Sequence, residues 1–204
     1  MNENYIDDAS QKDFLNLIHA RSGHFKLESG HHGNLWLDLD LLFLRPKDIQ
    51  RFIRELAGKI SAFKVDAVCG PMVGGALVAQ NIAMDLGIEF FYTERMVSQN
   101  SEDLYSAAYH LPFPLRKMID GKNIAIVDDV INAGSAIRGT LAELQSFGAR
   151  PVVIGALLVL GDPGQKYLAE RNFPLRSISH LPNEIWTPES CPLCVSQIPL
   201  SKLD

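Results

Sequence analysis

Two adjacent carboxylates and a loop of small residues form the stretch of this chain best suited to chemistry. An apolar run, 124–127, ends in Asp128 and Asp129, and the loop that follows, 132–136, precedes a helical pattern. Ionised carboxylates accept hydrogen bonds from sugar hydroxyls, and backbone N–H groups at a helix N-terminus attract a phosphate. This order predicts a site for a sugar phosphate. A strand that ends in an ordinary polar turn is the alternative.

The loop is expected to bind an anion mainly through its backbone. Gly134 permits the turn and a close approach of ligand, and Ser135 offers a hydroxyl that can also cap the helix. Because neighbouring residues of a strand face opposite ways, both acids reach one sugar only if the chain leaves the sheet near Asp129. The predicted phosphate-binding residues are Asn132, Ala133, Gly134, Ser135 and Ala136.

A glycine-rich turn follows another predicted strand, 64–69, and precedes a predicted helix, 74–86. Glycines there would let backbone N–H groups approach a second anion, although a sharp strand-to-helix turn often needs glycine anyway. The carboxyl ends of parallel strands meet at one edge of a sheet, so this turn is expected to lie beside Asp128. The predicted residues of the second anion site are Gly70, Pro71, Met72, Val73, Gly74 and Gly75.

The elements that must position these groups alternate between strand and helix from 46 to 160, which predicts an α/β fold with a mainly parallel, twisted sheet flanked by helices. The segments 1–45 and 162–204 flank this core and are expected to fold together as a small hood within the same domain. The expected helices cover about 10–20, 46–60, 74–86, 135–147 and 165–171, the expected strands 35–41, 64–69, 88–93, 123–127, 151–160 and 176–181, and 23–33 is expected to be a loop.

Composition excludes several classes of protein. The chain has 204 residues and a net charge of −5, which argues against generic binding of nucleic acid, and its length fits one sizeable domain. No stretch approaches 18 uninterrupted apolar residues, so no membrane span is expected, and the first residues show no signal-peptide pattern. Three cysteines make no disulfide framework, which favours a reducing cytoplasm.

The acids and the small loop resemble the signature of type I phosphoribosyltransferases, which bind phosphoribosyl pyrophosphate. The resemblance implies that fold, with Asp128 and Asp129 as the catalytic acids on ribose, 132–136 on the 5-phosphate and 70–75 on pyrophosphate. It also implies Mg²⁺ bound mainly through substrate oxygens, which needs few protein ligands. Asn132 and Ala136 replace residues that carry hydroxyls in the family, although the backbone donors remain.

Residues 23–33 resemble the hood segment that covers the base site of orotate phosphoribosyltransferases. This implies that Phe25 stacks on a pyrimidine and that Lys26 faces a base carboxylate, whereas a core position for Phe25 is the alternative. The same resemblance gives Arg95 a contact with pyrophosphate or base, and a surface salt bridge with a nearby glutamate is the alternative. The neighbouring histidines, His31 and His32, are expected to be solvated.

The tail carries a Cys-x-x-Cys pair, Cys191 and Cys194, and resembles the Cys-Pro-Leu-Cys ending of one bacterial branch of orotate phosphoribosyltransferase-like proteins. Such a pair is half of a zinc site. His180 is the only nearby candidate for a further ligand, and Cys69 belongs to a predicted core strand. The sequence analysis therefore expects no metal bound by protein ligands alone.

Members of the family carry a mobile lid rich in Lys and Arg, which often closes onto the partner subunit of a dimer. The corresponding stretch, 95–112, holds a single Lys or Arg, which is Arg95. A donor aimed at developing charge is worth roughly 3–4 kcal/mol. Turnover would therefore suffer unless Mg²⁺, Lys26, Arg116 or Lys117 compensates.

Two functions remain open from the sequence. The first is transfer of phosphoribosyl from phosphoribosyl pyrophosphate to a nucleobase, with orotate or a related pyrimidine favoured, by a homodimer that binds neither nucleic acid nor membrane. The second is a non-catalytic module that senses phosphoribosyl pyrophosphate or a nucleotide, which the missing basic lid favours.

Overall fold

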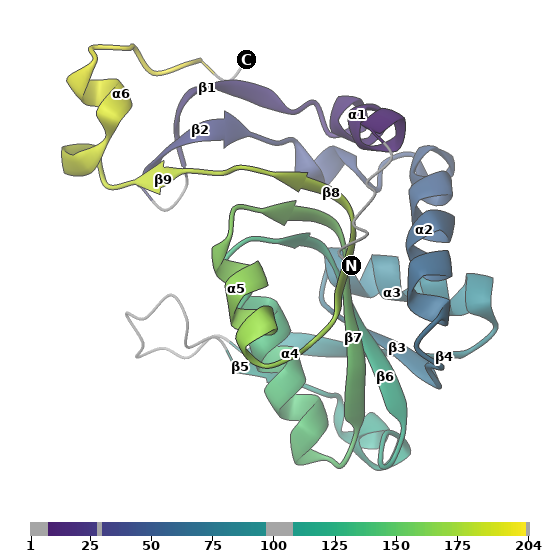
Figure 1. The fold of residues 1–204 in the computed structure, drawn as a ribbon. Helices are drawn as coiled ribbons and strands as arrows, with labels where there is room; N and C mark the ends of the chain where they lie inside the picture. Colours follow the sequence, from purple (N-terminus) through teal and green to yellow (C-terminus); the bar gives the residue numbers. More distant parts are fainter. Residues whose placement is uncertain (1–7, 28–29, 97–107, 203–204) are drawn as a thin grey trace.

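A six-stranded sheet with helices on both faces forms the body of the protein, and a three-stranded sheet lies at one end of it (Figure 1). The computed structural model describes residues 8–27, 30–96 and 108–202. The helices are α1 (Asp8–Leu17), α2 (Pro46–Ser61), α3 (Gly74–Leu86), α4 (Ser135–Ser146), α5 (Pro163–Glu170) and α6 (Pro192–Val195), with 3-10 turns at Leu39–Leu41, Phe113–Met118 and Pro188–Ser190. The strands are β1 (Arg21–Lys26), β2 (His32–Trp36), β3 (Ala67–Pro71), β4 (Glu89–Met96), β5 (Ala108–His110), β6 (Asn123–Ile131), β7 (Arg150–Leu160), β8 (Leu175–Leu181) and β9 (Ile185–Trp186).

The strand order of the large sheet is β5-β4-β3-β6-β7-β8, and every pairing in it is parallel except that of β5 with β4. From β3 the chain moves outward to β4, and it later returns to place β6 on the other side of β3. The strand order thus reverses between β3 and β6. In open α/β sheets the crevice at such a reversal is where ligands bind. The predicted α/β fold with a mainly parallel sheet is confirmed.

The helices cover both faces of this sheet, with α2 and α3 on one face and α4 and α5 on the other (Figure 1). One apolar cluster joins the predicted stripe of α2 to α3 and to the sheet, and a second lies under α4 and α5. Pro46 stands in the first turn of α2, where its missing N–H costs no helical hydrogen bond, and α3 ends as predicted before Gly87, whose φ of 68° is left-handed.

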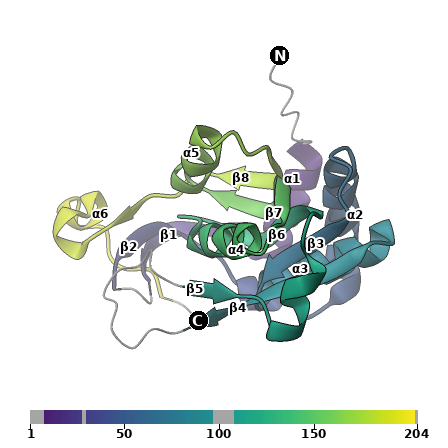
Figure 2. The ribbon, with the colours of Figure 1, turned by 90° about the horizontal axis from the view of Figure 1, so that it is seen from below.

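The three-stranded sheet, in the order β1-β2-β9, and the tail helix α6 make up the hood. Figure 2 shows α6 and this sheet on one side of the molecule, with α2 and α3 on the opposite side. The prediction of a loop over 23–33 is wrong, because β1 and β2 pair there as an antiparallel hairpin. The prediction of a strand over 35–41 is wrong beyond Trp36, where β2 ends and a 3-10 turn follows at Leu39–Leu41.

The described residues contain no helix with enough length and apolar character to span a bilayer.

Candidate functional site

Both acids remain within β6, which continues to Ile131 and pairs with β7 at Asp128 and Val130. The chain therefore stays in the sheet at Asp129, so the condition stated for both acids to reach one sugar is not met in that form. The acids still converge, because the pairing of β6 with β3 runs only as far as Ile126 and leaves the start of α3 beside them.

A glycine pair at the start of α3 receives the two carboxylates. A Cβ atom on Gly75 would lie 2.6 Å from Asp128 Oδ1, and one on Gly74 would overlap the carboxylate of Asp129. Real Cβ atoms do not approach oxygen this closely, so only glycine allows this contact between the acids and the loop. The structure thus brings together the two chain segments that the sequence analysis assigns to ribose and pyrophosphate.

Burial and charge affect the protonation of Asp128. Asp128 is 7% exposed. Burial and then the nearby charge of Asp129 raise the pKa of Asp128. The backbone N–H of Asp129 donates to Asp128 Oδ1 at 3.1 Å, and that of Val130 donates to Asp129 Oδ1 at 2.9 Å. Each carboxylate keeps further acceptor positions, which suit the hydroxyl hydrogens of a sugar or a hard cation.

The predicted phosphate loop borders a cavity of about 290 Å³ next to the acids. Gly134 has a φ of 78° and immediately precedes α4, whose first N–H groups have no partners within the helix. The start of α5 closes the far side of the loop, because the N–H of Gly164 donates to the carbonyl of Asn132 at 3.1 Å. The residues that line the cavity are Asp128, Val130, Asn132, Ala133, Gly134, Ser135 and Ala136.

The glycine-rich turn is tightly folded between β3 and α3. A Cβ atom on Gly70 would overlap the carbonyl of Gly75, and Met72 donates its N–H to the carbonyl of Thr93 at 2.8 Å. The peptide bond between Met72 and Val73 is cis. Both of those side chains are exposed, so the rim of the turn faces solvent beside the acids.

Arg95 lies on β4, where it pairs across the sheet with Tyr109 of β5. Burial raises the pKa of Tyr109, while the charge of Arg95 lowers it and that of Asp128 raises it. Tyr109 therefore lies close enough to Arg95 and to Asp128 for the charges of both to affect its pKa. Sequence reasoning missed Tyr109, because only the pairing of β5 with β4 brings it there. The remainder of the predicted lid, 97–107, lies outside the described residues.

The basic groups that end the lid segment are engaged elsewhere. His110 Nδ1 lies 3.1 Å from Glu143 Oε2. Arg116 donates from Nε to the carbonyl of Leu111 at 3.1 Å, and its guanidinium lies 5.2 Å from the centre of the Phe147 ring. These contacts fix the end of the lid segment to α4. The idea that Arg116 compensates for the missing lid cations is therefore not supported, since these contacts hold it away from the cavity lining.

A cation that the sequence analysis did not single out lies beside the phosphate loop. Arg138 stands in the first turn of α4, and its guanidinium carbon lies 4.0 Å from the centre of the Tyr167 ring. Its Nε would be 4.0 Å from a Cβ atom on Gly134. The signal available in the sequence was a basic residue two positions after the predicted anion loop.

The predicted base-binding residues occupy different environments on β1. Phe25 is 3% exposed, and its ring centre lies 6.0 Å from that of Trp36. This geometry favours the alternative considered above, a packing role inside the hood. Lys26 is exposed at the end of the strand.

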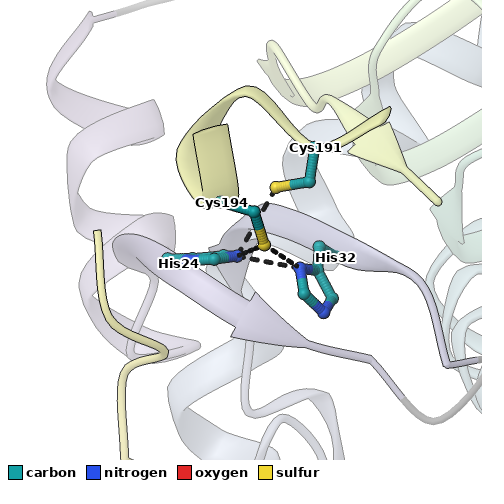
Figure 3. Close-up of side chains that lie close together, drawn as sticks. All are labelled: His24, His32, Cys191 and Cys194. Atoms are coloured by element: carbon teal, nitrogen blue, oxygen red, sulfur yellow. Dashed lines mark hydrogen bonds between the residues drawn. The ribbon is translucent and has the colours of Figure 1, made fainter. Parts of the chain in front are cut away.

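The tail cysteines lie beside two histidines rather than alone. Figure 3 shows His24 of β1 and His32 of β2 pointing toward Cys191 and Cys194. His180, the partner considered from the sequence, instead places Nε2 3.1 Å from the carbonyl of Gly161. The expectation that His32 is solvated is wrong, since its side chain is buried in this cluster.

Comparison with known proteins agrees with the geometry. The family model for the phosphoribosyl transferase domain matches residues 44–193. An orotate phosphoribosyltransferase of Carboxydothermus hydrogenoformans is 31% identical over 196 residues, which covers 94% of each chain. One from Caldanaerobacter subterraneus subsp. tengcongensis is 29% identical over 93% of this chain and 92% of its own. The fold is similar to the crystal structure of adenine phosphoribosyltransferase from Thermoanaerobacter pseudethanolicus, with a TM-score of 0.63 and 19% identity over 83% of this chain and 99% of that one.

Proposed function

This chain belongs to the phosphoribosyltransferase family, and on that premise we propose that it transfers phosphoribosyl from phosphoribosyl pyrophosphate to orotate or a closely related pyrimidine. The products are a nucleoside monophosphate and pyrophosphate. The observation that carries the proposal is the approach of two carboxylates to the start of α3, beside the cavity at the start of α4. The names of the relatives at about 30% identity support orotate as the base.

Each part of the donor substrate has a matching group. The 5-phosphate would lie against the N–H groups of 133–136, where the helix dipole of α4 favours an anion. Arg138 stands in the first turn of α4 and adds positive charge near this loop. The ribose hydroxyls would donate to Asp128 and Asp129. The pyrophosphate would lie at the start of α3, where glycines permit contact with the backbone.

The reaction breaks the bond between ribose C1 and a pyrophosphate oxygen while a ring nitrogen of the base bonds to C1. Positive charge develops on the ribose ring, and negative charge develops on the leaving group. The acids would stabilise the first through the ribose hydroxyls, and N–H donors at the start of α3 would stabilise the second. A donor of this kind contributes roughly 3–4 kcal/mol.

Mg²⁺ fits the donor set of the site. Asp128 and Asp129 supply hard oxygen atoms, which this ion prefers, and substrate oxygens would complete its coordination. The carboxylates adjoin the loop proposed for pyrophosphate, so anion would face anion there. A bound divalent cation supplies the charge neutralisation that lets both anions occupy one site.

We propose further that Lys26 and Arg95 contact the base and the leaving group, and that the active form is a homodimer in the cytoplasm. Light scattering of the purified protein tests the dimer. A monomer at assay concentration would contradict it without changing the proposed chemistry.

The test of function is release of pyrophosphate from phosphoribosyl pyrophosphate and Mg²⁺ with each of a panel of bases. We expect turnover with orotate, and loss of both donor binding and turnover in the double variant Asp128→Asn with Asp129→Asn, whose helical content stays unchanged. Turnover with a purine alone would contradict the assignment of the base. Saturable binding of the donor without turnover on any base would favour the sensing module, which is suggested by the presence of a single Lys or Arg in the segment 95–112.

A further inference from the structure

Four side chains with metal-binding atoms converge at the hood, remote in sequence from the acids of the large sheet (Figure 3). Two come from the β1–β2 hairpin and two from the tail, at the start of α6. Their ligand atoms all lie within 4.8 Å of one another, and three of the four residues are buried. The residues are His24, His32, Cys191 and Cys194.

The separations match the edges of a small coordination tetrahedron. His24 Nε2 lies 2.9 Å from His32 Nδ1, 3.5 Å from Cys191 Sγ and 3.7 Å from Cys194 Sγ. Cys194 Sγ lies 3.2 Å from His32 Nδ1. Zinc bonds of about 2.0–2.1 Å to nitrogen and 2.3 Å to sulfur give tetrahedral edges of about 3.3–3.8 Å. These four distances are close to this range, and the two remaining separations, from Cys191 Sγ to Cys194 Sγ and to His32 Nδ1, are at most 4.8 Å, so binding of an ion requires the Cys191 thiol to move inward.

A hydrogen bond from one neighbour would satisfy the atom at the centre of this cluster, but it does not explain why three polar side-chain atoms surround that atom. His24 Nδ1 lies 2.7 Å from the carbonyl oxygen of Ile198, which can only accept, so Nδ1 carries a hydrogen and Nε2 is the atom left to bind a metal. Nε2 of the same ring then has one lone pair, and three polar side-chain atoms face it. A cation shared by all four groups accounts for this convergence. The bond to the carbonyl is also the outer contact that usually orients a metal-binding histidine.

We propose that these four residues bind one zinc ion in a closed structural site. Two thiolates and two imidazoles favour tetrahedral Zn²⁺ over Mg²⁺ or Ca²⁺, which take oxygen ligands. Two thiolates also neutralise the charge of the ion, which suits a partly buried position. All four coordination positions are filled by protein, so the site holds structure and leaves no place for a substrate.

The C-terminal tail has few apolar contacts of its own that would hold it against the β1–β2 hairpin. Helix α6 has no buried residue of its own, and Val195 within it is 79% exposed. Strand β9, which joins the tail to β2, spans only Ile185–Trp186. A site that links His24 to Cys191, 167 positions apart, fixes the tail against the hairpin where apolar packing does not. On the proposed function, the same ion positions the strand that carries Lys26.

The first experiment measures metal in protein expressed with zinc and purified under reducing conditions. We expect about one zinc ion per chain, retained through gel filtration and lost in Cys194→Ser and His32→Ala. The matched control is His31→Ala, which changes the neighbouring histidine outside the cluster and should keep the metal. A chain without bound zinc, or equal loss in the control, would overturn the site. Because the readout is metal content, its failure leaves the proposed transfer reaction untouched.

The second experiment covers the case in which a variant fails to fold. Metal-free, reduced wild-type protein is titrated with Co²⁺, and we expect absorption bands from thiolate-to-cobalt charge transfer and from a tetrahedral ion. Added Zn²⁺ should displace them. The absence of these bands would contradict the proposal, as would a disulfide between Cys191 and Cys194 in protein isolated without exposure to oxidants.

Discussion

The large sheet and the hood hold together by different kinds of contact. The sheet has long strands, such as β7 (Arg150–Leu160), set between two apolar clusters. The hood has short strands and a tail helix without a buried residue, and its closest contacts link imidazole, thiol and carbonyl groups. Apolar packing of the large sheet therefore holds the anion loops in place, whereas contacts between a few polar atoms join the tail to the rest of the hood.

The largest effect is expected from a cavity in the sheet. Leu158 is fully buried in β7, and Leu158→Ala should lower the free energy of unfolding by about 2–5 kcal/mol, because both the apolar contacts and their volume are lost. Urea unfolding measures this change. The hood control is Val195→Ala, which removes a side chain that is 79% exposed and should change stability by less than about 0.5 kcal/mol. Equal losses in the two variants would remove the contrast between the regions.

The next effect concerns function rather than stability. In Gly75→Ala the new methyl group would lie 2.6 Å from Asp128 Oδ1 and 2.7 Å from Pro71 Cδ, so the acid or the loop must move. A loss of about 100-fold in transfer rate, equal to about 2.7 kcal/mol, is expected when the carboxylate leaves its position. Steady-state assays measure it.

Gly58→Ala is the matched control, because a Cβ atom there meets nothing within 4 Å and the residue is exposed in α2. That change should leave the rate unaltered and stabilise the helix by about 0.5–1 kcal/mol. A wild-type rate in Gly75→Ala would show that the close contact between glycine and acid has no role in turnover.

Removal of metal should loosen the hood and leave the sheet unaffected. After treatment of the reduced protein with a zinc chelator, hydrogen exchange should accelerate in β1, β2 and α6, while the protection of β3, β6 and β7 stays the same. Mass spectrometry of peptic fragments resolves the two regions. If adding zinc back restores the protection, the faster exchange came from loss of metal and not from irreversible damage to the protein. Equal acceleration of exchange in the hood and in the large sheet would contradict the separate origins of their stability.

The same contrast explains what the sequence could predict. Helices α2 and α3 carry local apolar patterns and end signals, and strand β7 is a continuous apolar run, so their prediction is confirmed with small shifts at the ends. The hairpin of β1 and β2 was missed, because its residues are rich in Gly, His and Ser and acquire order through pairing and through a tail far along the chain. Periodicity carries no signal for such contacts.

The candidate site divides in the same way. The acids and the two loops follow from the order of elements, since strand ends in a parallel sheet must meet. Tyr109 reaches the site through the pairing of β5 with β4, which residue types alone do not reveal. Arg138 could have been found from the sequence, because it stands two positions after the predicted loop. The proposed zinc ligands could be predicted only by knowing that His24 lies next to Cys191 in the folded chain.

The smallest effect tests whether the acids of the well-packed region cost stability. Burial and the charge of Asp129 raise the pKa of Asp128 in the folded protein above its value in the unfolded chain. Its favourable contribution is therefore complete below about pH 4, near the unfolded pKa, and is lost as the pH rises through the folded pKa. Asn stays neutral throughout, so Asp128→Asn should match the wild type at acidic pH and melt roughly 2–4 °C higher at neutral pH, the shift that about 1 kcal/mol produces.

Thermal unfolding from pH 4 to pH 8 without ligand measures this difference, with the exposed Asp162→Asn as control. Phosphoribosyl pyrophosphate with Mg²⁺ should reverse the order at neutral pH, because only the wild type then gains the free energy of binding. A variant that melts below the wild type at neutral pH without ligand would mean that the buried carboxylate contributes to the fold. In that case Asp128 would contribute both to the stability of the fold and to ligand binding. The ligand site would then not lower the free energy of unfolding of the sheet.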